Sequence, residues 1–319
     1  MMKFTQTIRK IFTNEDLNFL LTNRIPRHAV TVFMGWFSTI EQKWVRDLSI
    51  SVWRIFTDLD LSEAKKSHFN SLHDCFIRDL KEGARPINDD DQILVSPCDG
   101  IVGECGEIEH GQVFQAKGFP YQISELLGSY VDPQSLEGGA YVTLRLTSAM
   151  YHHFHAPYSG NIDRVVYHSG DTWNVNPIAL QRIEKLFCKN ERAMISMEIG
   201  TDKHRIYLVP VAAILVASIR LHGLDITLSR RYKGQHVLNC QIPCLKGQEL
   251  GWFEHGSTVI VFAPAGFKLL PGIFNGAQIK MGQALFELPV LNSHLRNQDV
   301  FCSERSSEKP LAALESPRY

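Results

Sequence analysis

The chain of 319 residues is 44% hydrophobic and 21% charged, and its formal net charge is −1. This composition is typical of a globular protein, and the near-zero charge gives no electrostatic reason to expect nucleic acid as a partner. The length suffices for one large domain with a helical appendage.

The first part of the chain, from about residue 12 to 82, is expected to be helical. Four apolar residues recur at helical spacing and make one face: Trp44, Leu48, Val52 and Ile55. Another apolar run, from Phe69 to Leu80, follows Ser67, which is the expected N-cap of a further helix. Gly83 and Pro86 then end the helical part.

The stretch 29–40 differs from its neighbours because it is uncharged and rich in aromatic residues, with Arg24 and Arg27 before it. A short helix of this kind can lie in the interface of a bilayer. It can equally pack against the body of the protein, since an amphipathic pattern is expected in both cases. No spanning helix is expected, because the longest apolar stretch, 206–219, contains Pro210 and is shorter than about 18–20 residues.

From about residue 88 the pattern changes to short strands between glycines and prolines, which favours a β-rich sandwich or barrel-like core. The expected strands are 92–96, 100–105, 113–116, 140–146, 160–167, 193–199, 205–209 and 214–219, with a short helix over 177–185. The polar end of the chain is expected to be disordered. The predicted fold is therefore α+β: an N-terminal helical segment over 1–85, a β-rich core over 86–290 and a polar tail over 291–319.

The seven cysteines give no sign of a metal site, because none belongs to a CxxC pair and Cys240 and Cys244 lack a second ligand pair nearby. They are expected to be reduced residues of a cytoplasmic protein. Two of the histidines at 152, 153 and 155 could ligate a metal, but no third ligand follows at a diagnostic spacing. No metal site is therefore predicted.

Three segments carry the residues of a nucleophilic site: Ser96–Gly100, Tyr151–Pro157 and Gly256–Thr258. Serine is a weak nucleophile until a base takes its proton, so Ser257 needs a histidine and an orienting carboxylate. His153 and His155 alternate, so both should point to one face of a strand, and His152 to the other. Taken singly, the first and third segments are ordinary turns, and the histidines are surface or hydrogen-bonded core residues.

Together, in this order and with these neighbours, the three segments resemble the pyruvoyl-dependent phosphatidylserine decarboxylases of the bacterial and mitochondrial type (type I). The resemblance runs from about Trp44 to Leu288. Further matching segments are Phe76–Leu80, Arg85–Ile87, Phe114–Gly118, Gly170–Asn176 and Leu186–Arg192.

The resemblance implies a proenzyme that cuts itself between Gly256 and Ser257. In the family an Asp–His–Ser triad drives this step, and the matching residues are Asp99, His155 and Ser257. Ser257 is then converted into a covalent pyruvoyl group, the implied cofactor. This group forms a Schiff base with phosphatidylserine, which loses CO₂ and becomes phosphatidylethanolamine. His152 matches a family histidine associated with decarboxylation and is a candidate proton donor.

The resemblance also implies partners. The substrate places the protein in phospholipid biosynthesis, as a peripheral protein at the cytoplasmic side of the cytoplasmic membrane. The aromatic residues and basic flanks of the N-terminal part make 1–85 the expected membrane-associating segment, and whether it is the anchor stays open. The two cleavage products are expected to stay together as a heterodimer, because 259–262 reads as a core strand. A higher oligomer is open, and nucleic acid is not expected.

The sequence departs from the family pattern at three places. His255 stands where a leucine usually precedes Gly-Ser-Thr, which puts the rate of cleavage in question. Thr147–Met150 replaces the usual polar lead-in to the Tyr-His pair. His153 replaces an arginine, and the lost charge would weaken the attraction of phosphate or carboxylate.

Two other functions use the same residues. A conventional serine hydrolase would employ the same triad, but the GxSxG elbow of that class is missing around Ser257. A non-catalytic homologue that binds lipid or another partner would keep the fold while its triad no longer reacts, and His255 keeps this alternative open.

Overall fold

The computed structural model describes residues 15–116, 119–215, 218–254 and 257–289. Residues up to Leu288 form one compact unit. Of the second unit, Pro289–Tyr319, only Pro289 is described, so the expectation of a disordered tail lies outside the described residues. His255 and Gly256 also lie outside the described residues.

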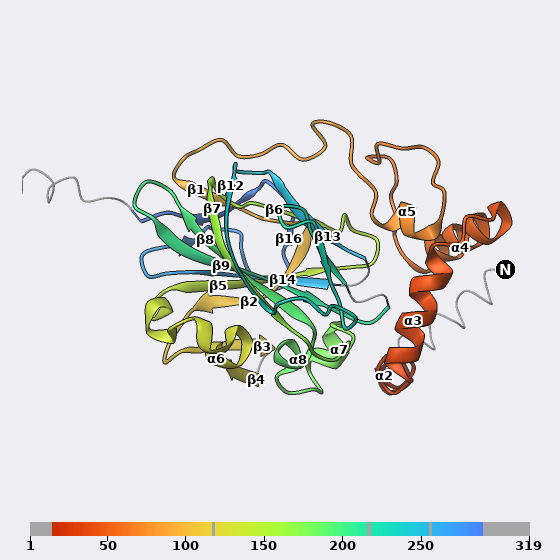
Figure 1. The fold of residues 1–319 in the computed structure, drawn as a ribbon, viewed down its shortest axis with the longest axis horizontal. Coiled ribbons are helices and arrows are strands. Elements are labelled where there is room, and N and C mark those ends of the chain that lie inside the picture. Colours follow the sequence, from red (N-terminus) through yellow and green to blue (C-terminus); the bar gives the residue numbers. More distant parts are fainter. Residues whose placement is uncertain (1–14, 117–118, 216–217, 255–256, 290–319) are drawn as a thin grey trace, which may run out of the picture. The chain divides into compact units, whose positions relative to one another are not determined.

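Within the described residues, four helices precede the β-rich part (Figure 1): α2 (Glu15–Asn23), α3 (Arg27–Ser38), α4 (Lys43–Phe56) and α5 (Leu72–Phe76). The expected helical start of the chain is confirmed, with two corrections. Residues 57–71 contain no helix, and the last helix begins after Ser71, whose hydroxyl accepts a hydrogen bond from the Asp74 N–H at 3.1 Å. Ser67 is therefore not the N-cap that the sequence predicted.

The second helical run is short because the chain pairs with itself on either side of α5. The Lys65 N–H donates to the Asp79 carbonyl at 2.9 Å, and the Lys81 N–H donates to the Glu63 carbonyl at 2.9 Å. Leu80 consequently lies in a bridge with Ala64 instead of on a helix. This pairing holds the residues that follow α5 against the core.

The largest sheet has eight antiparallel strands. In spatial order they are β12 (Val237–Cys244), β7 (Gly160–His168), β8 (Arg192–Ile199), β9 (His204–Ala212), β14 (Ser257–Ala263), β5 (Ala140–Leu146), β2 (Gly100–Glu107) and β16 (Gln278–Ile279). The strand β14 is therefore central, with β9 on one side and β5 on the other.

Three smaller sheets accompany it. One has four strands in the order β11 (Ile226–Leu228), β10 (Ile219–Leu221), β13 (Glu249–Phe253) and β6 (His153–His155). Another has three strands in the order β1 (Ile93–Val95), β17 (Ala284–Glu287) and β15 (Lys268–Leu269). The last pairs β3 (Gln112–Ala116) with β4 (Phe119–Gln122). The short helices are α6 (Ile123–Leu127), α7 (Pro177–Leu180) and α8 (Leu186–Lys189), with 3₁₀ turns at Gly128–Tyr130 and Pro133–Leu136.

Hydrophobic packing occurs on both faces of the eight-stranded sheet. Along β14, Val259 and Val261 belong to one buried cluster, and Ile260 and Phe262 belong to the other, as the two-residue period of a strand requires. The first cluster joins the sheet to β6, β10 and β13, and the second joins it to α6, α7, α8, β3 and β4. Figure 1 shows α6, α8, β3 and β4 grouped together beside the sheet.

The predicted α+β class is confirmed, with helices first and a β-rich core after them. Among the described strands, no sheet closes into a barrel. The expected strand 214–219 is wrong: Ile214 and Leu215 lie in a turn, and Leu215 has a φ of 72°, which a regular strand does not allow. The strand β10 begins only at Ile219.

Candidate active site

Ser257 is the first residue of the central strand β14. Its backbone pairs with Leu146 of β5 and Ala212 of β9, and its side chain is fully buried. Its hydroxyl has no hydrogen-bond partner among the described residues. A buried hydroxyl left unpaired costs about 1–3 kcal/mol, so its position needs an explanation beyond packing.

Asp99 lies directly before β2 and is almost completely buried. The guanidinium of Arg85 donates two hydrogen bonds to its carboxylate, from Nε to Oδ1 at 2.8 Å and from Nη2 to Oδ2 at 2.6 Å. The Met281 N–H donates to Oδ1 at 2.9 Å. Although burial opposes it, the hydrogen bonds and charge of Asp99 raise the pKa of Arg85, so the guanidinium keeps its charge.

His155 ends β6 and is held as a neutral imidazole. Its Nδ1 lies 3.0 Å from the Gly247 carbonyl, which can only accept, so Nδ1 carries the proton. Its Nε2 therefore accepts from the Tyr151 hydroxyl at 3.1 Å. Burial lowers the pKa of His155 to about 4, which keeps the ring uncharged at neutral pH. This is the tautomer that a general base requires, with the lone pair on Nε2.

The fold brings these three residues to one end of the core. Ser257 pairs with Leu146, and Ile101 pairs with the adjacent Arg145, so Ser257 and the start of β2 flank the same end of β5. The His155 N–H donates to the Pro97 carbonyl at 2.8 Å, two residues before Asp99. No hydrogen bond within the described part of the chain joins the three side chains to one another, and the triad contacts remain a prediction.

The histidine segment is arranged as its alternation predicts. The rings of His153 and His155 both lie near the Tyr151 ring, with centroids 4.6 and 5.7 Å away, so they share one face of β6. His152 is fully buried, its Nδ1 lies 2.9 Å from the Met150 carbonyl, and its ring centroid is 4.0 Å from that of Phe76 in α5. Its role as a proton donor stays a prediction.

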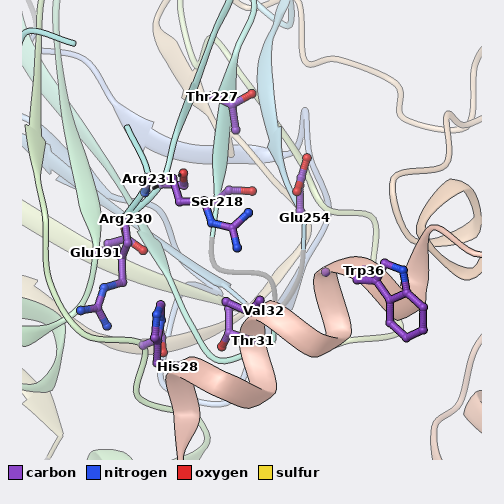
Figure 2. A pocket seen from close by; sticks show the side chains of 13 residues that line it. His28, Thr31, Val32, Trp36, Glu191, Ser218, Thr227, Arg230, Arg231 and Glu254 are labelled. Atoms are coloured by element: carbon purple, nitrogen blue, oxygen red, sulfur yellow. Dashed lines mark hydrogen bonds between the residues drawn. The ribbon is translucent and has the colours of Figure 1, made fainter. Parts of the chain in front are cut away.

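A pocket of about 430 Å³, which we call the α3 pocket, lies beside the end of the described chain at Glu254. Glu254, three residues before Ser257, and Ser218 both line it. Figure 2 shows α3 running along one side with His28, Thr31, Val32 and Trp36. Arg230 and Arg231, from the segment after β11, supply cations. The α3 pocket thus combines an apolar helix with two arginines and with the acidic residues Glu191 and Glu254.

Glu191 gives the α3 pocket a group that titrates near neutral pH. Burial raises the pKa of Glu191 to about 7, although the Tyr167 hydroxyl donates to its Oε1. Its Oε2 has no hydrogen-bond partner among the described residues. The sequence gives Glu191 no role beyond its place in the matching segment Leu186–Arg192, because nothing local distinguishes it from a surface glutamate.

Sequence reasoning also missed the partner of Asp99 and the cations of the α3 pocket. Arg85 precedes Asp99 by 14 residues, and only the fold brings their side chains together. The adjacent pair Arg230 and Arg231 is a visible signal, but an arginine pair on a loop is ordinary without knowledge of the pocket beside it.

Comparison with known proteins identifies the family. The family model for phosphatidylserine decarboxylase matches residues 72–287. A phosphatidylserine decarboxylase proenzyme from Saccharophagus degradans is 32% identical over 282 residues, which cover 86% of this chain and 98% of that protein. The proenzymes from Salmonella paratyphi B and Salmonella newport are each 32% identical over 275 residues, covering 82% of this chain and 84% of theirs. The chain belongs to the phosphatidylserine decarboxylase family.

The helix α3 covers most of the stretch 29–40, for which both packing on the body and contact with a membrane were expected. At its start, Arg27 pairs with Asp171 at 2.7 Å and lies 3.5 Å above the Trp173 ring, so the helix packs on the body of the protein. Its aromatic side remains exposed, with Phe33 at 53% and Trp36 at 63%. No helix in the described ranges is both long and apolar enough to span a bilayer.

The helix α4 carries a second exposed apolar face. The predicted helical face is present, but it points away from the core: Trp44 is 72% exposed and Leu48 is 59% exposed. Val52, Ile55 and Phe56 are exposed as well. We call the exposed apolar residues of α3 and α4 the N-terminal apolar face, and its members are Val32, Phe33, Trp36, Trp44, Leu48, Val52, Ile55 and Phe56.

Proposed function

We propose that this chain is a self-processing phosphatidylserine decarboxylase whose pyruvoyl group is made from Ser257. The observation that carries the proposal is the hydroxyl of Ser257, which is buried at the start of a central strand and has no hydrogen-bond partner among the described residues. Glu254, three residues before it, lines a pocket with cationic and apolar walls. Membership of the family gives this arrangement its chemical meaning.

In the proposed self-cleavage, His155 accepts the hydroxyl proton of Ser257, and Asp99 supports the imidazolium that forms. His155 becomes available once the Tyr151 hydroxyl leaves its Nε2. The Ser257 Oγ then attacks the Gly256 carbonyl carbon, the C–N bond breaks, and the nitrogen takes a proton to give an ester and a free amine. Loss of the Ser257 Cα proton expels the Gly256 carboxylate, and water converts the remaining dehydroalanine into a pyruvoyl group with release of ammonia.

The residues around Ser257 fit this group. The site is buried, so water has little access to it, and no side chain from the described residues occupies the hydrogen-bonding position of its oxygen. A pyruvoyl carbonyl supplies an electron sink for the loss of CO₂ from an amino acid headgroup. Arg230 and Arg231 would bind the phosphate or carboxylate of phosphatidylserine, and His152 is our candidate for delivering the proton that replaces CO₂.

Replacing both Arg230 and Arg231 with glutamine should raise KM for phosphatidylserine about tenfold or more while self-cleavage continues. A hydrogen bond to a charged group contributes about 1.5–3 kcal/mol, and each 1.4 kcal/mol is a factor of ten in binding. Initial rates of CO₂ release against lipid concentration measure the effect. Arg205→Gln is the matched control, because Arg205 pairs with Asp163 on β7. An unchanged KM in the double variant would remove these arginines from the headgroup site.

We further propose that the N-terminal apolar face docks the protein peripherally on the cytoplasmic side of the membrane. The phosphatidylserine substrate carries acyl chains, so an enzyme that acts on it must work at a bilayer. Two neighbouring helices exposing tryptophan, phenylalanine and leucine form the kind of apolar patch that marks an interaction surface.

Vesicle binding tests this docking surface. Trp44→Ser combined with Leu48→Ser should lower cosedimentation with anionic vesicles at least tenfold, because burying such side chains is worth about 1.5–3 kcal/mol each. Deletion of residues 1–40 should also reduce it. Leu245→Ser is the matched control, since Leu245 is 71% exposed but lies in the turn between β12 and β13. Equal binding by all variants would reject the N-terminal apolar face as the anchor.

The two proposed products would remain together as a heterodimer. The smaller one, 257–319, contributes β14 to the middle of the large sheet and β17 to the sheet with β1. Removing it would expose the fully buried residues of β14 on both faces. Size-exclusion chromatography followed by denaturing analysis would show whether both products travel in one peak.

Intact-mass measurement of the purified protein tests the proposed function, together with CO₂ release from phosphatidylserine vesicles. We expect two chains, 1–256 and 257–319, the second lacking a free amino group and ending in a pyruvoyl group. A single uncut chain with no CO₂ release would favour the non-catalytic homologue. An uncut chain that hydrolyses esters would favour the serine hydrolase.

A further inference from the structure

A second group of reactive side chains lies beside His155, on the face of β6 that His153 and His155 share. Asp79, His153 and Glu249 each offer one possible ligand atom, and these three atoms lie within 4.8 Å of one another. All three residues line a cavity of about 580 Å³. None belongs to the predicted triad, and the α3 pocket shares no lining residue with this cavity.

The decisive side chain is His153, which is only 3% exposed. Its Nε2 lies 3.0 Å from the Ile77 carbonyl, and a carbonyl can only accept, so Nε2 bears the proton. Its Nδ1 faces the Glu249 Oε1 at 3.0 Å without completing a hydrogen bond. Two atoms that can ligate a metal thus lie 3.0 Å apart at a buried position, an arrangement that a shared cation would stabilise.

The geometry suits a metal ion. Zn²⁺ binds histidine nitrogen at roughly 2.0–2.1 Å and carboxylate oxygen at roughly 2.0–2.2 Å, so two ligands about 3 Å apart can share one ion. A ligating histidine commonly donates its other N–H to a backbone carbonyl, as His153 does to Ile77. Asp79 is exposed and can close the remaining distance.

His222 supports the arrangement from the cavity side. Its Nε2 lies 2.6 Å from the Glu249 Oε1, and its ring centroid lies 5.0 Å from that of Trp252. The carboxylate of Glu249 is thereby oriented between two imidazoles. His222 is a positioning residue for Glu249, or a further ligand when it turns toward the ion.

We propose that Asp79, His153 and Glu249 form a binding site for one divalent transition-metal ion, with Zn²⁺ as its preferred occupant. Imidazole nitrogen combined with carboxylate oxygen selects such ions over Ca²⁺ or Mg²⁺, which prefer oxygen ligands alone. The cavity leaves a coordination position open to solvent. An ion here would connect the segment after α5 to β6 and β13, whose residues His153 and Trp252 are paired.

Calorimetric titration of the metal-stripped, full-length protein with ZnCl₂ tests the proposal. We expect one saturable site per chain, a rise in melting temperature with zinc, and tetrahedral d–d absorption when Co²⁺ replaces it. His153→Arg should abolish all three effects, because the guanidinium can pair with Glu249 but cannot ligate a metal. Asp79→Asn should weaken zinc binding at least tenfold.

Exposed His110 provides the matched control, and His110→Gln should bind zinc like the wild type. Comparing melting temperatures without zinc shows whether His153→Arg is folded, and Asp79→Asn gives an independent test at an exposed position. Absence of saturable binding would overturn the proposal. Undiminished binding by both variants would also overturn it, because the ion would then lie elsewhere, for instance on cysteines.

Discussion

Ser257→Ala should leave one uncut chain of 319 residues with no decarboxylase activity. The substitution removes the only atom that can start the N-to-O acyl shift and the precursor of the pyruvoyl carbonyl. Because both the cleavage and the electron sink depend on this residue, we expect a loss of activity to background. Intact mass and CO₂ release from phosphatidylserine vesicles measure the two consequences separately.

Ser218→Ala is the matched control for this result. The Ser218 hydroxyl is also buried without a partner among the described residues, and it lines the α3 pocket. The Ser218→Ala variant should still cleave itself into two chains. If Ser257→Ala still yields two chains, the scissile bond and the assignment of Asp99, His155 and Ser257 are both wrong. Uncut Ser218→Ala would show instead that the pocket wall takes part in the reaction.

Arg85→Ala should lower the free energy of unfolding by about 3–5 kcal/mol, since removing one partner of a buried ion pair leaves the other charge uncompensated. The side chains of Arg85 and Asp99 are 7% and 8% exposed, and two hydrogen bonds join them. Urea denaturation measures the change. It is best performed with Ser257→Ala present, so that a single chain unfolds and the two-state treatment applies.

Arg27→Ala is the comparison, because the Arg27–Asp171 pair is also short, at 2.7 Å, but its partners are 18% and 37% exposed. A more exposed pair contributes less, so we expect a loss of about 1 kcal/mol from the ion pair. The free energy of unfolding of Arg85→Lys should lie between those of Arg85→Ala and the wild type, because an ammonium cannot form the bidentate contact of a guanidinium. Equal losses for Arg85→Ala and Arg27→Ala would mean that burial does not set the strength of the Asp99 pair.

The sequence predicted most accurately where local pattern and burial agree. The apolar run after Ser257 became the central strand β14, and the alternation of His153 and His155 placed both rings beside Tyr151. The spacing of apolar residues correctly predicted that α4 is a helix with one apolar face. That face is exposed, however, because periodicity reports which residues share a side and not what covers that side.

Other features depend on residues distant in the chain and have no local signal. The Arg85–Asp99 pair and the Asp79–His153–Glu249 cluster both form between separate elements. Ser67 has the chemistry of an N-cap, but backbone pairing on either side of α5 confined that helix to the residues after Ser71. Tertiary pairing therefore overrode local preference at this point.

Two residues of α3, Val32 and Trp36, belong both to the lining of the α3 pocket and to the N-terminal apolar face. If that face rests on a bilayer, the pocket opens sideways into the lipid interface instead of into water. A substrate headgroup would then need to pass only the helix α3 to reach the pocket, while its acyl chains stayed in the membrane. Full extraction of the lipid, at about 0.8 kcal/mol for each CH₂ exposed, would be avoided, and turnover would depend on the lateral supply of lipid.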